Sequence, residues 1–150
     1  MKYSYKLSDA IHVLAYLLLC PDSDHSSKAI AASVEANPSV IRSIMSDLRK
    51  ANLLSSHQGS VKPTLVKSPS EISLFDIHQA LNVNHHLFYV DPDTNQNCIV
   101  RRNIQPVLQN VYGEIEKDAE KKMMEISLED IVKQINQQIA DHASSNENTN

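Results

Sequence analysis

Apolar residues recur at three- and four-residue steps through most of this chain, which is the spacing of one helix face. In the first half, the pattern predicts helices over residues 7–20, 26–34, 38–51 and 73–81. In the second half it predicts a long amphipathic helix over residues 98–126 and a last helix over 128–139. Only residues 53–67 have a strand–loop–strand pattern, and the chain has just two glycines, so we expect a mainly α fold.

Residues 26–51 have the layout of a helix-turn-helix, two short helices joined by a tight turn. Asn37 and Pro38 supply an N-cap and a proline at the first helical position, and Asn52 stands where a left-handed terminator is needed. Ser8 is the expected N-cap of the first helix. The second helix of the motif is predicted to turn apolar residues inward (Ile41, Ile44, Met45 and Leu48) and cations outward (Arg42, Arg49 and Lys50).

A short hairpin follows this motif directly, with strands expected over residues 53–57 and 64–67. A hairpin in this position is a wing, which reaches the neighbouring minor groove or the phosphates. The fold class is therefore a winged helix-turn-helix with a two-stranded wing and a long C-terminal dimerisation helix. We expect a DNA-binding domain over residues 1–81, a connector loop over 82–97, the dimerisation and closing helices over 98–140, and a disordered polar tail over 141–150.

The long predicted helix carries one apolar stripe and an otherwise charged surface. In a chain of this size, the expected partner for such a stripe is the same helix of a second copy, which predicts a homodimer. The stripe consists of Ile104, Val107, Leu108, Val111, Ile115, Ala119 and Met123.

Charge is distributed unevenly along the chain, whose net charge is −4. Residues 26–67 hold six basic and two acidic residues, a net +4, inside an otherwise acidic sequence. A local basic segment of this kind favours binding to phosphate groups. No apolar run is long enough to span a membrane, no secretory signal is expected, and two cysteines are too few for a disulfide scaffold, so we expect a cytoplasmic protein.

Three segments together resemble the Rrf-two family of bacterial winged-helix repressors, which includes IscR-, NsrR- and CymR-type regulators. They are NPSVIRSIMSDLRKANLLSS (residues 37–56), a wing starting at Gly59, and EISLFDIHQAL (residues 71–81). The resemblance is detailed over residues 7–81 and looser through the long helix and residues 127–131. It implies a homodimer with crossing long helices that binds a roughly palindromic double-stranded DNA operator.

The resemblance also implies which residues contact DNA. It assigns recognition to Ser39, Arg42 and Ser43 early in the third helix and to Gln58 and Gly59 in the wing, and it places Ser27 and Lys28 near phosphates. An arginine at position 42 would favour guanine through its bidentate fork; the alternative is a solvated charge. Arg49 and Lys50 are phosphate contacts or solubility charges, and Lys62 in the wing is expected to contact phosphate.

The sequence departs from the family pattern in two places. Many members hold an iron–sulfur cluster with three cysteines in the connector, where this chain has only Cys98. One local cysteine cannot hold such a cluster, so we predict no cofactor. The wing has Ser60-Val61-Lys62-Pro63 in place of a glycine run, which makes it stiffer. The adjacent pair His85-His86 lacks the helical spacing of a metal site, so we predict no metal.

The sequence also allows two other functions. Cys20 and Cys98 could act as redox thiols of a regulator, although Cys20 follows three leucines and is expected to be buried and inert. The altered wing and negative net charge also allow a protein–protein adaptor that has lost DNA binding. No nucleophile–base pair, glycine-rich phosphate loop or catalytic carboxylate pair is recognisable, so we do not expect an enzyme, and no residue pattern points to an effector.

Overall fold

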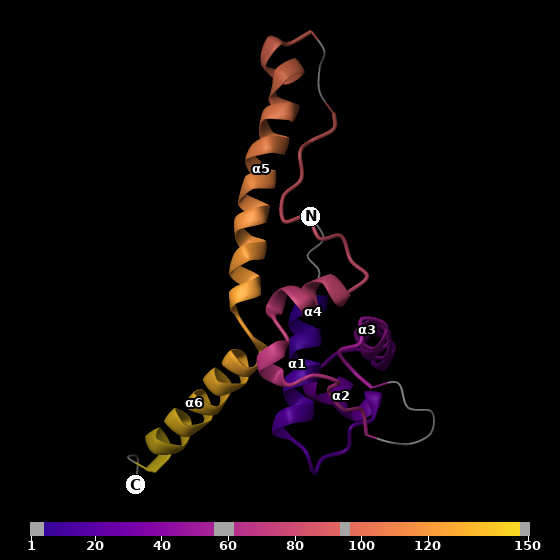
Figure 1. Ribbon diagram of the computed structural model, residues 1–150, viewed down its shortest axis with the longest axis vertical. Helices are drawn as coiled ribbons and strands as arrows, with labels where there is room; N and C mark the ends of the chain where they lie inside the picture. Colours follow the sequence, from indigo (N-terminus) through magenta and orange to yellow (C-terminus); the bar gives the residue numbers. More distant parts are fainter. Residues whose placement is uncertain (1–4, 56–61, 94–96, 148–150) are drawn as a thin grey trace.

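The computed structural model describes residues 5–55, 62–93 and 97–147. Its elements are α1 (Lys6–Leu19), α2 (Ser27–Val34), α3 (Pro38–Lys50), the 3₁₀ turn η1 (Pro69–Glu71), α4 (Leu74–Ala80), α5 (Ile99–Glu125) and α6 (Leu128–Glu147). Helices α1–α4 pack into one body, from which α5 projects as a long rod with the connector beside it (Figure 1). Helix α6 leaves the base of α5 at an angle. The prediction of a mainly helical fold is confirmed.

Helix α1 lies at the centre of the body and contacts α2, α3, α4 and α6. Its apolar positions recur at helical spacing, and Val13 and Leu14 are completely buried. Each fully buried side chain of this size contributes about 1.5–3 kcal/mol of transfer free energy. The core is completed by residues from every packed element: Ile30, Ile41, Ile44, Leu48, Leu54, Ile72, Ile77, Leu81 and Leu128. Among the helices of the described residues, none has both the length and the apolar character needed to cross a bilayer.

The helix caps and turns of the helix-turn-helix lie close to where the sequence predicts them. The Ser26 hydroxyl accepts from the Ala29 amide at 3.2 Å, and Asn37 caps α3 as predicted. Asn52 has a φ of 58°, so the predicted left-handed terminator is confirmed. Glu35 has a φ of 57° and makes the turn between α2 and α3. A glutamate therefore occupies a position that glycine fills with less strain.

Replacing Glu35 with glycine is expected to stabilise the fold by about 1 kcal/mol, because a non-glycine residue pays roughly that much in the left-handed region. Urea unfolding would measure the change as a higher midpoint. Glu35→Ala is the matched control, since alanine removes the same side chain and keeps the strain. Equal stability of the two variants would show that the positive φ at this position does not lower the free energy of unfolding.

The first helix begins earlier than expected. Its N-terminal cap position is Tyr5, which has no side-chain capping hydrogen bond, and Ser8 lies inside the helix. The prediction of Ser8 as N-cap is therefore wrong. Residue Tyr5 starts the helix through its carbonyl, which accepts from the Asp9 amide at 2.9 Å.

The base of the wing is paired, but the described residues contain no strand there. Leu54 and Leu65 form an isolated antiparallel bridge, and the Ser55 amide donates to the Thr64 carbonyl at 2.8 Å. The Thr64 amide donates to the Ser55 hydroxyl at 3.1 Å, and Pro63 has no amide hydrogen, so the ladder does not extend. The predicted two-stranded wing is thus not confirmed. Its loop, with the predicted contacts Gln58 and Gly59, lies outside the described residues.

The last helix is longer than predicted. It continues to Glu147, so the prediction of disorder from residue 141 is wrong for residues 141–147. Side-chain hydrogen bonds within the helix support this polar end, such as Gln137 Nε2 to Asp141 Oδ1 at 2.9 Å and the Ser144 hydroxyl to the Ala140 carbonyl at 3.1 Å. Ile139, in the second half of this helix, is 58% exposed.

The bend between α5 and α6 is bonded to the segment between η1 and α4. The Leu74 amide donates to the Ile126 carbonyl and the Leu128 amide to the Ile72 carbonyl, both at 2.8 Å. Leu128 itself is completely buried in the core. Because these bonds fix the root of α5, the direction of the rod is set relative to the helix-turn-helix.

Candidate nucleic-acid interface

Helix α3 places two chemically different faces on opposite sides. Ile41, Ile44 and Leu48 are completely buried, whereas Arg42 and Ser43 are exposed. The helix lies on the side of the body away from α6, so its polar face points to solvent (Figure 1). Arg42 makes no hydrogen bond or ion pair with any other described residue. Its guanidinium is therefore available to a ligand.

The first turn of α3 is held by the Asn37 cap. Asn37 Oδ1 accepts from the Ser39 amide at 2.9 Å and from the Ser39 hydroxyl at 2.8 Å. The hydroxyl hydrogen of Ser39 is therefore engaged in the cap, while its oxygen lone pairs remain able to accept. Of the predicted contacts, Ser39 is thus suited to accept a hydrogen bond rather than to donate one.

Other predicted DNA contacts fall into two groups. Lys28 and Lys50 are exposed, and neither pairs with another described residue; Ser27, in the first turn of α2, is half-buried. By contrast, Arg49 Nε donates to the Ser55 carbonyl at 3.2 Å, and Lys62 Nζ donates to the Pro21 carbonyl at 2.8 Å. Arg49 and Lys62 therefore also tie the wing to the body.

The ammonium of Lys62 lies near a carboxylate. Hydrogen bonds from the Ser26 amide and hydroxyl, at 2.8 and 3.1 Å, hold the pKa of Asp24 below its ordinary value, and the charge of Lys62 lowers this pKa further. The base of the wing is thereby anchored next to the turn between α1 and α2. A phosphate contact by Lys62 would compete with this bond.

Two buried polar residues were not expected from the sequence. Asp47 is 8% exposed, and its Oδ2 accepts from the Asn82 amide at 3.2 Å, which joins α3 to the end of α4. His25 is equally buried, and its Nε2 lies 2.7 Å from the Cys20 carbonyl oxygen. The helical pattern of residues 38–51 places Asp47 at an inward position next to Leu48, and this signal could have predicted its burial. The Asp47 contact thus joins α3 to the chain just after α4, and the His25 contact lies within the turn between α1 and α2.

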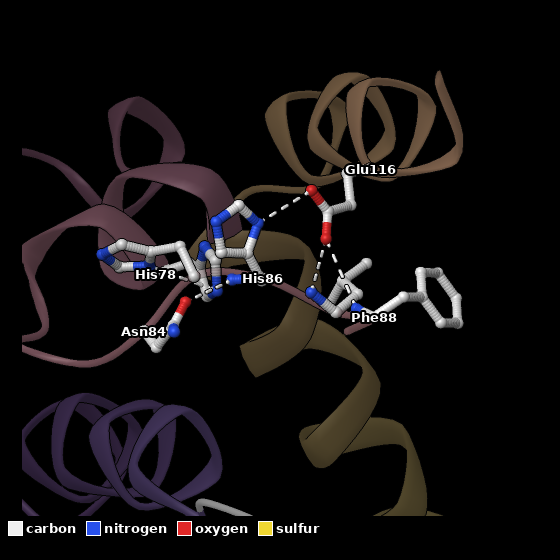
Figure 2. A network of polar contacts seen from close by, with 7 residues as sticks. His78, Asn84, His86, Phe88 and Glu116 are labelled. Atoms are coloured by element: carbon white, nitrogen blue, oxygen red, sulfur yellow. Dashed lines mark hydrogen bonds and ion pairs between the residues drawn. The ribbon is translucent and has the colours of Figure 1, made fainter. Parts of the chain in front are cut away.

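The connector is fastened to α5 by two side chains of that helix: Glu116 (Figure 2), and Gln105, whose Nε2 donates to the Asp91 and Pro92 carbonyls at 2.9 and 3.2 Å. Glu116 Oε1 accepts from the Leu87 and Phe88 amides at 2.8 and 3.4 Å, and Oε2 lies 3.2 Å from His86 Nδ1. Burial alone would raise the pKa of Glu116, but these hydrogen bonds together lower it below its ordinary value. The Phe88 ring packs on Tyr112 with centroids 5.3 Å apart. The predicted connector loop is therefore ordered along α5 over residues 82–93.

A buried histidine lies where the connector leaves α4. His78 is 8% exposed, its Nε2 lies 3.5 Å from His85 Nδ1, and its Nδ1 has no hydrogen-bond partner among the described residues. Burial lowers the pKa of His78, and the charge of His85 lowers it further, against an opposing effect of Glu120. The protonated form of His78 is thus disfavoured in the folded protein.

Acidification is expected to destabilise the protein, starting near the ordinary histidine pKa of about 6.5. Because the pKa of His78 is lowered by folding, its contribution to stability is complete above that value and is lost as pH falls through the folded pKa. Urea midpoints measured from pH 8 to pH 5 would show the slope. His78→Gln should reduce that slope, and an unchanged slope would assign the effect to other groups.

The apolar stripe of α5 is open to solvent. Helix α5 has no buried residue over its 27 positions, and Ile104, Val107, Val111 and Ile115 are 38–57% exposed. The other predicted members, Leu108, Ala119 and Met123, are partly buried. A row of large apolar side chains at helical spacing on one helix is typical of an interface.

The two cysteines flank different helices, α1 and α5, and neither forms a disulfide. Cys20 follows the end of α1 and Cys98 precedes the start of α5, and both are half-buried. Within the residues that the structure describes, no group of three or more histidine, cysteine or acidic side chains is arranged to hold a metal ion. Iron–sulfur clusters require several thiolates together, so this donor set does not fit one.

Comparison with known proteins places these features in a family. Residues 3–134 match the family described as "Rrf2: Iron-dependent Transcriptional regulator". The "Putative HTH-type transcriptional regulator YwnA" of Bacillus subtilis (strain 168) is 35% identical over 127 residues, which cover 85% of this chain and 94% of that protein. Among solved structures, one titled "Crystal structure of a putative DNA binding protein" is 32% identical with a TM-score of 0.67 and covers 84% of this chain and 97% of its own. IscR of T. potens, 22% identical with a TM-score of 0.64, shares the fold over 90% of this chain and 88% of its own.

The match spans the helix-turn-helix, the connector, α5 and the start of α6. The family and the Bacillus relative are transcriptional regulators, not enzymes. The resemblance inferred from residues 37–81 is thus confirmed: the chain belongs to the Rrf2 family of transcriptional regulators.

Proposed function

We propose that this regulator is a repressor that binds a roughly palindromic DNA operator as a homodimer. The observation that carries the proposal is the outer face of α3, where Arg42 and Ser43 are exposed while the opposite face is buried in the core. This arrangement leaves the second helix of the helix-turn-helix able to enter a major groove. Lys28 and Lys50, both exposed, add positive charge for phosphates beside it.

The open stripe of α5 supports the dimer. Val107, Val111 and Ile115 are 57%, 44% and 45% exposed, and an identical helix packed against them would cover all three. Since the root of α5 is bonded to the η1–α4 segment, two crossing α5 helices would hold two copies of α3 in a fixed relation. In such a dimer, half-sites lie about one DNA turn, roughly 34–36 Å, apart.

The proposed regulator works without an iron–sulfur cluster. Its whole chain has two cysteines, one at the end of α1 and one at the start of α5, and they form no disulfide. A signal would therefore reach α3 by another route, through the connector that Glu116 holds against α5 and that Asn82 joins to Asp47 of α3.

Fluorescence anisotropy tests the proposal directly. The purified full chain is titrated into labelled DNA from its own upstream region and into scrambled DNA, over a series of salt concentrations. We expect the upstream DNA to bind at least about 10³-fold more tightly than the scrambled DNA, with a steep salt dependence from released counterions. Equal binding to both, or no binding at low salt by a folded dimer, would contradict the proposal and favour a protein–protein adaptor.

A further inference from the structure

A cavity of about 420 Å³ opens between the connector and the middle of α5. Its size is in the range of sites that take small organic ligands, and four of its eight lining residues carry rings: His86, Phe88, Tyr89 and Tyr112. We propose that this cavity binds an organic cation, an amine or quaternary ammonium that carries apolar groups. This ligand class follows from three features of the lining: its aromatic rings, its negative charge, and the space left by the missing side chain of Gly113.

Aromatic rings form the walls. Phe88 of the connector and Tyr112 of α5 pack against each other, with centroids 5.3 Å apart and planes tilted by 33°, and together form one wall. Tyr89 adds a third ring, 60% exposed, which meets His86 edge-on at 6.4 Å. The faces of aromatic rings carry negative potential, so the ring surfaces that remain open to this cavity attract a cation, above all one with bulky apolar substituents.

The charge of the lining has the matching sign. Glu116 contributes a carboxylate whose side chain is 18% exposed, and the lining contains no lysine or arginine. The named partners of this carboxylate are two backbone amides and His86, whose side chain is 66% exposed. A ligand cation would therefore meet an anion that has no permanently charged counterion in the cavity. An anionic ligand would be repelled at the same place.

The floor of the cavity is open at Gly113. A Cβ built there meets no atom within 4 Å, so a larger side chain would project into open space. Glycine is among the poorest helix formers, so its place in the interior of α5 gains nothing for the helix itself. Gly113 is two residues from both Val111 and Ile115, which puts it on the opposite side of the helix. A dimer formed through the stripe would thus leave this floor uncovered by that contact.

Calorimetric titration of the full chain with benzyltrimethylammonium chloride tests the site. Benzyl alcohol and phenylacetate serve as neutral and anionic controls with the same ring. We expect saturable binding of one cation per chain, about tenfold or more tighter than the neutral control, and no binding of the anion. A neutral control that binds as tightly as the cation, or no saturable binding of the cation, would overturn the proposal.

Substitutions locate the binding in this cavity. Gly113→Leu should abolish it by filling the space, whereas Gly113→Ala, which favours the helix and leaves most of the room, should retain it within about threefold. Glu116→Gln should weaken it by about tenfold or more. Unchanged binding to Gly113→Leu would place the ligand elsewhere. Gly113→Leu removes none of the groups that bond Glu116 to the connector, so it decides the question even if Glu116→Gln loosens the connector. These measurements involve no DNA, so a failure of operator binding would not affect their outcome.

Discussion

Replacing Val111 with glutamate is expected to convert the proposed dimer into monomers. Val111 lies in the middle of the open stripe of α5 and is 44% exposed in the single chain. In a two-fold dimer each subunit would bring one carboxylate into the same apolar interface, and leaving such a charge buried without a partner costs several kcal/mol. Light scattering after size exclusion should give a mass near 16.8 kDa for the variant and twice that for the wild type.

Affinity for the operator should decrease when the dimer is lost. Two linked recognition helices gain from effective concentration, so the monomer should lose affinity by about 10²-fold or more. Asn110→Glu is the matched control, because it adds the same charge at an exposed polar position one residue away. The control should remain dimeric and bind normally. A Val111→Glu protein that stays dimeric would show that the stripe is not the interface.

The features that sequence predicted well are local ones. The cap at Asn37, the left-handed Asn52 and the inward Ile41, Ile44 and Leu48 depend on residues within a turn or two of each other. Helical periodicity likewise gave α5 to within one residue at each end. Polar composition wrongly predicted disorder near the end of the chain. The polar residues after Ile139 continue the helix and form side-chain hydrogen bonds within it.

Long-range contacts could not be predicted in this way. The bond from Lys62 to the Pro21 carbonyl joins residues 41 apart, and the contacts of Glu116 with the connector span 28–30 positions. No periodicity links such residues, so the sequence predicts only a phosphate contact for Lys62 and assigns Glu116 no contact at all. The cavity beside Glu116 lies between α5 and the connector that these contacts help to hold in place.

Arg42→Ala is expected to reduce affinity for the operator by about 1–3 kcal/mol, or roughly 5- to 150-fold. Arg42 is exposed in the second turn of α3 and forms no bond with another described residue, so the substitution removes a DNA contact and disturbs no core packing. A guanidinium that bonds a guanine edge in each half-site would also relax the preference at one base pair per half-site. Anisotropy against operators varied at single positions would measure both effects.

Two comparisons separate base recognition from charge. Arg42→Lys keeps the positive charge and loses the planar fork, so it should lose affinity for the operator while binding scrambled DNA as the wild type does. Lys50→Ala, late in the same helix, should weaken binding to both DNAs alike, as expected of a phosphate contact. If Arg42→Ala also weakens both equally, Arg42 contacts phosphate, and specificity must come from other groups, such as the Ser39 oxygen or Ser43.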